Sequence, residues 1–361
     1  MSKERVLLAM SGGIDSSVTA ILLKDKGYDV IGVTYRSWDS ISKACMEKET
    51  GCCTVESIFD AKNLAKELGF EHHIIDFKQE FRETIIKDFI SEYLSGRTPN
   101  PCVRCNQYIK WGELIDKANE LNCKFIATGH YARIRNENNR YILSKGIDNY
   151  KDQSYFLWML SQENLKRTLF PLGNYKKDEI RKIAEKRGYT SLSKKRESQE
   201  ICFIPDNNYR RFLKDEVPEL ITDIGEGNFV DTKGNIIGKH KGFPFYTIGQ
   251  RKGLEVAVGY PLYVVKILKD ENKIVLGTRD ELKRNFMEVD NVVLNKYESL
   301  PENFEVVTKI RYRNKGSLSR INLANGKIKV EFYDQISAIT PGQSAVFYEG
   351  NDLVGGGLIC N

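Results

Sequence analysis

The strongest constraint on the fold is a regular alternation of apolar runs and helix-like segments over the first 130 residues. The apolar runs have the length of buried strands and lie at 6–10, 29–35, 71–77 and 124–131. The segments with helical periodicity lie at 11–27, 56–69 and 78–95. Strands joined by helical crossovers form parallel sheets, so we predict an α/β fold with a doubly wound parallel sheet. Such sheets bind ligands at the carboxyl ends of their strands.

The sequence pattern of the rest of the chain changes from helical to mostly β at about residue 206. Before it, the sequence predicts three more helices, at 152–160, 161–170 and 176–188. After it, Gly, Asp and Asn become frequent, and alternation around Asp270–Asn272 predicts a β-hairpin at 264–277. The pattern from 284 to 361 is wholly β and predicts a small closed barrel, in which no strand edge is left exposed.

Charge and hydropathy limit the partners of the chain. No run approaches the roughly 18 apolar residues of a membrane span, and the start is too brief for a signal peptide, so we expect a cytoplasmic protein without a membrane partner. The net charge of +6 is too mild to indicate nucleic acid. Two basic runs are more informative: 176–196 has nine Lys/Arg against three acids, and 309–330 has seven and no acid. Solvated faces often carry such runs, yet together they favour a phosphate-rich partner.

The segment SGGIDSS at 11–17 directly follows the first predicted strand and opens a helix. Its glycines allow a tight turn and close approach to a ligand, and the amides of a helix N-terminus attract an anion. The serine hydroxyls can donate hydrogen bonds, and Asp15 can hold Mg²⁺ against phosphate oxygens. The lysine of a Walker P-loop is missing. We therefore predict a phosphate-binding loop of another kind, the alternative being a strand–helix turn capped by serine.

Eight cysteines in a chain without a secretion signal are expected to be reduced. Cys102 and Cys105 form a C-x-x-C pair in TPNPCVRCN, which fits a redox pair, metal ligands or coincidence. Cys105 is predicted to lie just before a helix, where the helix amides lower a thiol pKa. Cys202 ends an apolar stretch, and a buried strand cysteine is the alternative for it. Cys123 is expected to be a core residue, and nothing in the sequence around Cys360 indicates a function for it.

Two further polar clusters lie near the predicted ligand face. TGHYA at 128–132 places Gly129 and His130 at the exit of a strand. Lys151, Asp152 and Gln153 precede a predicted helix, which they could simply cap.

Eight motifs in one order carry a resemblance to a known family. They are SGGIDSS, GRTPNPCVRCN, TGHYAR, KDQSYFL, ICFI, TIGQRKGL, RYR and TPGQSAVFY. The first resembles the PP-loop of ATP pyrophosphatases, and the whole set is similar, from end to end, to bacterial tRNA-specific 2-thiouridylases. The resemblance implies a PP-loop catalytic domain at 1–205, a small, mostly β central domain at 206–283, and a C-terminal β-barrel that contacts tRNA at 284–361.

The resemblance also implies the chemistry, which is 2-thiolation of the wobble uridine of tRNA with ATP and Mg²⁺. Adenylation converts the C2 oxygen into a leaving group that persulfide sulfur then replaces. By match to the family, Cys202 is the persulfide carrier and Cys105 its partner nucleophile. A transient disulfide between them would end the turnover, and a cysteine desulfurase or relay protein would supply the sulfur.

Binding residues carry over by the same match. ATP would be held by Ala9, Met10, Ser11, Gly12, Gly13, Ile14, Asp15, Ser16, Tyr35 and Gly129. The target base, splayed out of a single-stranded loop, would meet Asn100, Pro101 and Cys102. Contacts to tRNA would come from His130, Lys151, Asp152, Gln153, Arg311, Tyr312, Arg313 and Gln343. For Arg311–Arg313 the alternative is an ordinary barrel strand with outward arginines.

One departure from the family leaves the mechanism open. Many members have aspartate where this chain has Cys102, so an acid–base role does not transfer. Cys102, Cys105 and Cys202 could instead hold a [4Fe–4S] cluster, as in iron–sulfur-dependent tRNA thiolases. Cys45, Cys52 and Cys53 form a second cluster that could relay sulfur or electrons. We favour the persulfide route, with three alternatives: the cluster, a PP-loop ligase acting on a small molecule, and a tRNA-binding module with an inactive nucleotide site.

Overall fold

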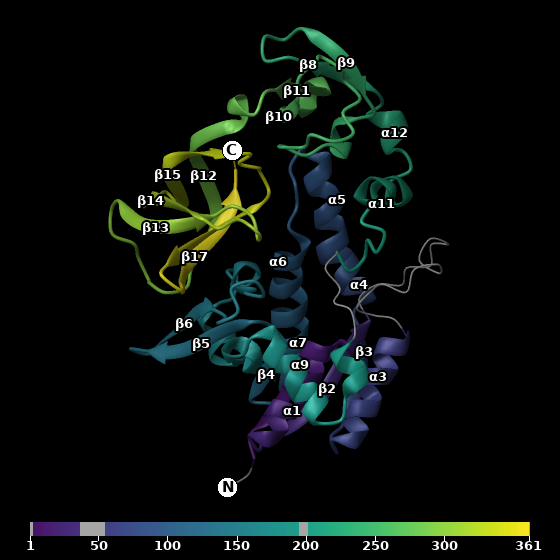
Figure 1. Ribbon diagram of the computed structural model, residues 1–361, viewed down its shortest axis with the longest axis vertical. Helices are drawn as coiled ribbons and strands as arrows, with labels where there is room; N and C mark the ends of the chain where they lie inside the picture. Colours follow the sequence, from purple (N-terminus) through teal and green to yellow (C-terminus); the bar gives the residue numbers. More distant parts are fainter. Residues whose placement is uncertain (1–2, 37–54, 195–200, 361) are drawn as a thin grey trace. The chain divides into compact units, whose positions relative to one another are not determined.

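The chain forms two compact units in the computed structural model, which describes residues 3–36, 55–194 and 201–360 (Figure 1). The first unit comprises 1–85, 102–207 and 351–353. The second comprises 86–101, 208–350 and 354–361. Within the described residues, no helix is both long and apolar enough to cross a membrane.

A five-stranded parallel sheet forms the centre of the first unit, in the order β3-β2-β1-β4-β7. Its strands are β1 (Arg5–Ala9), β2 (Asp29–Arg36), β3 (His72–Asp76), β4 (Phe125–Ala127) and β7 (Thr168–Leu169). Val6 of β1 pairs with Val30 on one side and Phe125 on the other. The strand order reverses between β1 and β4, which places the ligand crevice at their carboxyl ends. The predicted doubly wound parallel sheet is confirmed.

Helices cover this sheet. The apolar stripe of each helix is buried against apolar side chains on one face of the strands. Val6 and Leu8 of β1 pack with Ala20 of α1 and with Ala61 and Leu64 of α3. The α-helices of the unit are α1 (Ile14–Asp25), α3 (Val55–Glu67), α4 (Lys78–Phe81), α6 (Pro101–Cys105), α7 (Leu114–Glu120), α8 (Gln162–Lys166), α9 (Lys177–Lys186) and α10 (Thr190–Ser193). Short π- and 3₁₀-helical segments lie at Arg82–Ile86, Asn106–Glu113, Ser154–Phe156 and Pro171–Asn174.

The helix around the C-x-x-C pair begins earlier than the sequence predicts. α6 starts at Pro101, and the helical backbone continues through the π-helical Asn106–Glu113 into α7. Proline suits the first helical position, because its missing N–H has no intrahelical acceptor there. The prediction that Cys105 precedes the helix is therefore wrong. Cys105 has helical φ −61° and ψ −41°, one turn inside, so the helix-terminus argument does not apply to it.

The region 152–170 also differs from the sequence prediction of two helices. Ser154–Phe156 is a single 3₁₀ turn, α8 covers Gln162–Lys166, and the chain then adds β7 to the sheet. Tyr155, Leu157, Trp158 and Leu160 are all at most 1% exposed, a burial on all sides that a surface helix with one apolar face cannot provide. The predicted helix at 152–160 is wrong, and that at 161–170 is correct only for its first half.

The sequence analysis also missed an antiparallel hairpin, β5 (Ala132–Glu137) with β6 (Arg140–Lys145). Its two-residue turn, Asn138-Asn139, has positive φ at both positions (51° and 63°). Asparagine tolerates this left-handed conformation, which a type I′ hairpin turn requires. The Asn-Asn pair in NENNR was therefore an available signal.

The second unit begins with helix α5 and a small sheet. The helices are α5 (Lys87–Leu94), α11 (Tyr209–Glu216) and α12 (Leu220–Asp223). The sheet, in the order β10-β11-β8-β9, consists of β8 (Gly227–Val230), β9 (Ile236–His240), β10 (Tyr263–Leu268) and β11 (Lys273–Gly277). Short 3₁₀ turns lie at Phe243–Phe245, Lys269–Glu271 and Asp280–Leu282. The predicted β10–β11 hairpin is confirmed, with Asn272 at φ 44° in its turn.

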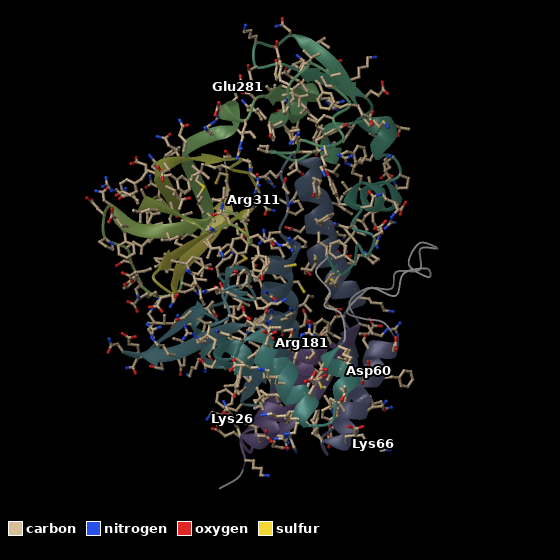
Figure 2. All side chains as sticks on the ribbon, viewed as in Figure 1. Lys26, Asp60, Lys66, Arg181, Glu281 and Arg311 are labelled. Carbon is tan, nitrogen blue, oxygen red and sulfur yellow. The ribbon has the colours of Figure 1, made fainter. Side chains whose placement is uncertain are left out.

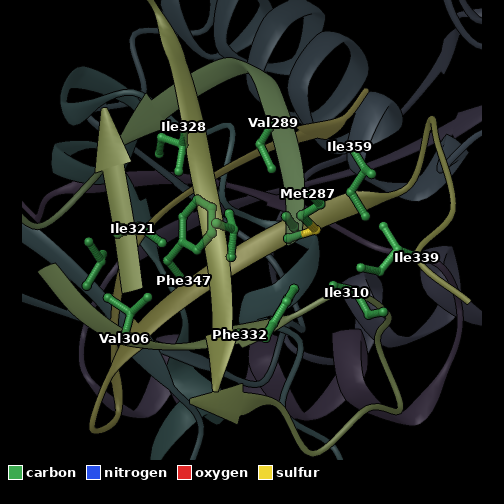
Figure 3. Packing of buried hydrophobic residues seen from close by; sticks show 13 residues of the cluster. Met287, Val289, Val306, Ile310, Ile321, Ile328, Phe332, Ile339, Phe347 and Ile359 are labelled. Carbon is green, nitrogen blue, oxygen red and sulfur yellow. The ribbon is translucent and has the colours of Figure 1, made fainter. Parts of the chain in front are cut away.

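A closed six-stranded antiparallel barrel completes this unit, as predicted. Its strands are β12 (Lys283–Leu294), β13 (Phe304–Lys309), β14 (Ser317–Ala324), β15 (Lys327–Ser337), β16 (Ser344–Glu349) and β17 (Asp352–Ile359). They run in the order β12-β15-β14-β13-β16-β17, and pairing of β12 with β17 closes the circle. Met287, Val289 and Phe347 fill its interior, where each is fully buried (Figure 3). Since the barrel interior is packed with side chains, any ligand must bind its outside or its loops.

Candidate functional site

The phosphate-binding loop predicted at Ser11–Ser17 lies at the carboxyl end of β1, where the sheet order reverses. Gly13 is the N-cap of α1, and Gly12 has φ +66°. A Cβ atom at Gly12 would lie 2.1 Å from the Ser57 carbonyl oxygen, so no other residue fits without moving α3. Ser16 Oγ accepts from the Ser11 amide at 3.2 Å and donates to the Gly13 carbonyl at 3.1 Å. The loop is thus a preformed turn at a helix N-terminus, the arrangement that binds phosphate.

The exit of β4 approaches this loop directly. A Cβ atom at Gly129 would lie 3.0 Å from the Asp15 carbonyl carbon and 3.0 Å from the Ser16 amide nitrogen. Glycine at 129 therefore allows two segments that follow neighbouring strands to meet at the switch point. This brings together two groups of residues that the resemblance assigns to ATP.

The Asp15 carboxylate is held by two partners that the sequence analysis did not identify. Lys177 Nζ lies 2.8 and 2.9 Å from its two oxygens, and the Tyr131 hydroxyl donates to Oδ1 at 2.6 Å. The Lys177 side chain is only 8% exposed, whereas that of Asp15 is 33% exposed. An ammonium group is therefore fixed beside the phosphate loop, in a chain that lacks the Walker lysine.

The start of α9 places this lysine. The backbone amide of Lys177 donates to Asp148 Oδ2 at 2.9 Å, and Glu179 Oε2 accepts from the amide of Lys176 at 2.7 Å. Ile180 and Ala184 bury the same helix against Ile14 and Val18 of α1. In the sequence Lys177 is one of nine cations in a basic run, and nothing local distinguishes it from its exposed neighbours.

Magnesium has no ready-made protein site here. In the described part of the chain, no group of three His, Cys, Asp or Glu side chains is placed to hold a metal ion. Both Asp15 oxygens already face Lys177. The residues fit Mg²⁺ only as an ion that arrives with the phosphates, and Asp15 as its ligand stays a prediction.

The residues assigned to the adenine end of ATP follow β1 and β2. Met10 is buried, its amide donates to Val33 O at 2.8 Å, and its carbonyl accepts from Thr34 Oγ1 at 2.9 Å. Tyr35 is half-buried near the end of β2, with its ring centroid 6.2 Å from that of Phe77. Ala9, Met10 and Tyr35 therefore lie at neighbouring strand ends on the ligand edge of the sheet.

His130 is a buried, neutral residue. Burial, with a smaller repulsion from Lys110, lowers its pKa well below the ordinary 6.5. Its Nδ1 is 2.7 Å from Thr128 Oγ1, and its ring packs against Trp111 and Phe170 at centroid distances of 5.7 and 5.9 Å. A neutral imidazole in an aromatic pocket shapes the exit loop of β4. Its predicted contact with tRNA stays a prediction, which this burial does not favour.

The cluster Lys151, Asp152 and Gln153 is largely engaged within the protein. Asp152 is 5% exposed, and its carboxylate accepts from the amides of Gly146 and Ser154 and from the Ser154 hydroxyl. Gln153 Oε1 accepts from the Tyr131 amide at 3.0 Å. These two side chains fix backbone and side-chain groups of neighbouring segments. In the described stretch 154–160 no α-helix follows them to be capped, so the capping alternative does not apply, and their contact with tRNA stays a prediction.

Cys102 and Cys105 lie one turn apart on α6, and neither forms a disulfide with another described cysteine. Cys102 is exposed, and Cys105 is half-buried. Val103 is 1% exposed, and the Asn106 side-chain amide donates to Phe156 O at 2.9 Å, which anchors the helix between the two cysteines and just after them.

Cys202 is an exposed thiol in a short turn, so its buried-strand alternative is wrong. The next two residues are the anchors: Phe203 is 2% and Ile204 1% exposed, and Phe203 packs edge-on against Phe81 at 5.7 Å. Cys45, Cys52 and Cys53 lie outside the described residues. Among the described residues, Cys102, Cys105 and Cys202 do not form a group placed to hold a metal ion, so a [4Fe–4S] cluster has no preformed site there.

In the second unit, Asn100 ends a segment without helix or strand, Pro101 begins α6, and Arg311–Arg313 form a loop. Arg311, labelled in Figure 2, and Arg313 are exposed between β13 and β14, so the barrel-strand alternative for these residues is wrong. Gln343 does not point its amide outward, because Nε2 donates to the Thr98 carbonyl at 3.1 Å and to the Pro99 carbonyl at 2.8 Å.

Comparison with known proteins covers nearly the whole chain. Three family models match in sequence: the "tRNA methyl transferase HUP domain" over 4–206, the "tRNA methyl transferase PRC-barrel domain" over 210–278, and the "Aminomethyltransferase beta-barrel domain" over 284–359. The tRNA-specific 2-thiouridylase MnmA of Cytophaga hutchinsonii is 52% identical over 99% of this chain and 98% of its own length. Its counterpart in Amoebophilus asiaticus is 54% identical over 99% of this chain and 96% of its own.

Proposed function

This chain belongs to the tRNA-specific 2-thiouridylase family, and we propose on that premise that it replaces the C2 oxygen of the wobble uridine of tRNA with sulfur at the expense of ATP. The observation that carries the proposal is the similarity to proteins of that name from end to end, over all three matched parts. The phosphate loop with its buried lysine supports the ATP-dependent half of the reaction. The exposed thiol of Cys202 supports the sulfur-transfer half.

The nucleotide half uses the groups at the sheet switch point. We propose that the amides of Ser11–Ser16 and the Lys177 ammonium hold the pyrophosphate portion of ATP, with Ala9, Met10 and Tyr35 at the adenine and Gly129 closing the site. The uracil C2 oxygen attacks the α-phosphorus, the α–β phosphoanhydride bond breaks, and pyrophosphate leaves. Bound Mg²⁺ supplies charge neutralisation on the phosphates, and Asp15 positions Lys177 for the same purpose.

The sulfur half uses two thiols of the first unit. We propose that a persulfide donor, such as a cysteine desulfurase or relay protein, transfers a sulfane sulfur to Cys202. The Cys202 persulfide attacks C2 and expels AMP, which leaves the base joined to Cys202 through a disulfide. The Cys105 thiolate then attacks the Cys202 sulfur, forms a Cys105–Cys202 disulfide, and releases 2-thiouridine. The electron pair that reduces the sulfane sulfur thus comes from the two cysteines, and an external thiol must restore them.

The tRNA contacts are proposed by domain. We propose a catalytic domain at 1–205, a central domain at 206–283 and a tRNA-contacting barrel at 284–361. Arg311 and Arg313 supply phosphate affinity, with Tyr312 between them to stack, while Lys151 adds a further cation. Asn100, Pro101 and Cys102 meet the target base.

A direct test measures the product. Purified protein with ATP, Mg²⁺, a persulfide source and a tRNA carrying uridine at position 34 is expected to form 2-thiouridine, detected by nucleoside mass spectrometry. The same tRNA with cytidine at position 34 is the control. Pyrophosphate release stimulated by small amines and not by tRNA would identify a small-molecule ligase. Binding of tRNA without any ATP turnover would identify an inactive binding module.

Iron content separates the persulfide route from a cluster. Because the described cysteines do not form a metal site, protein purified without oxygen is expected to contain far less than one iron per chain and still to thiolate tRNA. Iron and acid-labile sulfide analysis, on the same preparation as the activity assay, makes the measurement. Stoichiometric iron whose removal abolishes thiolation would contradict the persulfide route.

Salt dependence tests the source of tRNA affinity. The run 309–330 has seven Lys/Arg and no acid, so binding is expected to rest on phosphate contacts. Raising monovalent salt from about 50 to 200 mM is expected to weaken tRNA binding, with a rise in the Kd on the order of 10²-fold for about four such contacts. Filter binding with unmodified tRNA measures it, and a flat profile would argue against a phosphate-based interface.

A further inference from the structure

We propose that Gln343 is a positioning residue, whose side-chain amide fixes the backbone of Thr98 and Pro99 directly ahead of the base-contacting Asn100 and Pro101. The inference rests on the proposed function, which gives Asn100 and Pro101 their role. It differs from the sequence-based expectation that Gln343 itself contacts tRNA. A glutamine amide has two N–H donors, and this one uses both within the protein.

Three hydrogen bonds join the segment to one turn of the barrel. Gln343 Nε2 donates to the carbonyl oxygens of Thr98 (3.1 Å) and Pro99 (2.8 Å). The Thr98 amide donates to the Pro341 carbonyl at 2.9 Å in the opposite direction. All these residues belong to the second unit. The backbone of 98–99 therefore has its polar groups paired with the turn 340–343.

The turn is itself a rigid support. Gly342 has φ +87°, and a Cβ atom there would lie 2.8 Å from the Thr98 carbonyl oxygen, so only glycine allows this approach. The Gly342 amide donates to the Ile359 carbonyl at 2.9 Å, and the Ile359 amide donates back to the Gln343 carbonyl at 2.9 Å. Strand β17 thus fixes the turn 340–343, and this turn fixes residues 98 and 99.

The segment needs such a support because it cannot stabilise itself. Residues 97–100 belong to no helix or strand. Pro99 and Pro101 have no N–H group, so neither can donate a backbone hydrogen bond. A side-chain donor that reaches two successive carbonyls replaces what a neighbouring strand would provide.

The same turn also braces the loop proposed to contact tRNA. Arg311 Nη2 donates to the Ala338 carbonyl at 2.8 Å and lies 3.2 Å from Thr340 Oγ1. Both the arginine loop and the base-contacting segment are therefore fixed to residues 338–343 of the barrel. Gln343 holds only the base-contacting segment. Its loss is therefore expected to misplace the reacting base without removing cations from the tRNA interface.

The experiment replaces Gln343 with methionine, which keeps the length and removes the donors. Q335M is the matched control, since Gln335 is exposed on β15 of the same barrel. We expect Q343M to lower the rate of tRNA-dependent pyrophosphate release at saturating tRNA by roughly 10- to 100-fold, the penalty of misplacing a reacting group. The tRNA Kd should change less than about threefold. Hydrogen exchange of the Thr98 amide should accelerate in Q343M and not in Q335M.

A Q343M variant with weaker tRNA binding and an unchanged rate at saturation would overturn the proposal in favour of direct RNA contact. Unchanged exchange at Thr98 would also overturn it, and this readout needs no activity. If Q343M folds poorly, Q343E supplies the same test with a polar side chain of equal size that cannot donate. Absence of tRNA-dependent turnover in the unmodified protein would instead contradict the proposed function.

Discussion

Cys202→Ser is expected to abolish formation of 2-thiouridine, by on the order of 10³-fold or more, while tRNA-dependent release of pyrophosphate remains measurable. A serine hydroxyl cannot carry a sulfane sulfur, whereas adenylation requires only the nucleotide site and the target base. The exposure of Cys202 on a turn anchored by Phe203 and Ile204 lets a donor protein reach it without unfolding the region. Nucleoside mass spectrometry and a pyrophosphate assay on the same reaction separate the two halves.

Cys360→Ser is the matched control for this experiment. Burial, with a smaller contribution from Asp290, raises the pKa of the Cys360 thiol to about 11, so very little of it is thiolate at neutral pH and it is a poor nucleophile. Its loss is expected to change thiolation less than about twofold. Thiolation that persisted in Cys202→Ser would remove this residue from the mechanism.

Lys177→Met is expected to lower tRNA-dependent pyrophosphate release by roughly 10²- to 10³-fold, the effect of deleting one preorganised charge from a reacting site. Its side chain is only 8% exposed, and its ammonium contacts both carboxylate oxygens of Asp15 at the N-terminus of α1. Single-turnover release of pyrophosphate measures the effect, with the Kd for ATP measured separately.

Two further variants separate catalysis from folding. Lys176→Met removes the exposed neighbouring lysine and should leave the rate within about twofold of the unmodified protein. Lys177→Met alone leaves the Asp15 carboxylate without its cation, so Asp15→Asn combined with Lys177→Met should recover any lost thermal stability but not activity. A double variant with normal pyrophosphate release would show that Lys177 serves the fold only.

The parts of the fold that follow local patterns could be predicted from the sequence. The strand–helix alternation, the β10–β11 hairpin and the individual strands of the barrel each depend on the spacing of apolar residues within about 20 positions. The tight turn from β1 into α1 was predictable for the same reason, because the two glycines and three serines of SGGIDSS occupy one short segment. The family resemblance added the proposed roles of the cysteines, which no spacing reveals.

What could not be predicted depends on pairs far apart in the chain. Lys177 and Asp15 are 162 residues apart, and only the packing of α9 on α1 brings them together. Gln343 and Thr98 are separated by 245 positions. The start of α6 was misjudged for a different reason. Prolines at 99 and 101 indicate an extended chain, but the second is also a good first residue of a helix.

Closure of the barrel by β12 and β17 has a consequence for how the protein is made. Val289 must wait for Ile359, its partner 70 residues later, before the last pair of strands can form. At about 5–20 residues per second of synthesis, β12 spends roughly 4–14 s with one edge uncovered. During that interval the nascent chain presents an open β-edge, where neighbouring polypeptides on a crowded ribosome can attach. Slow translation of this stretch should therefore lower the yield of active protein more than slow translation of the N-terminal half.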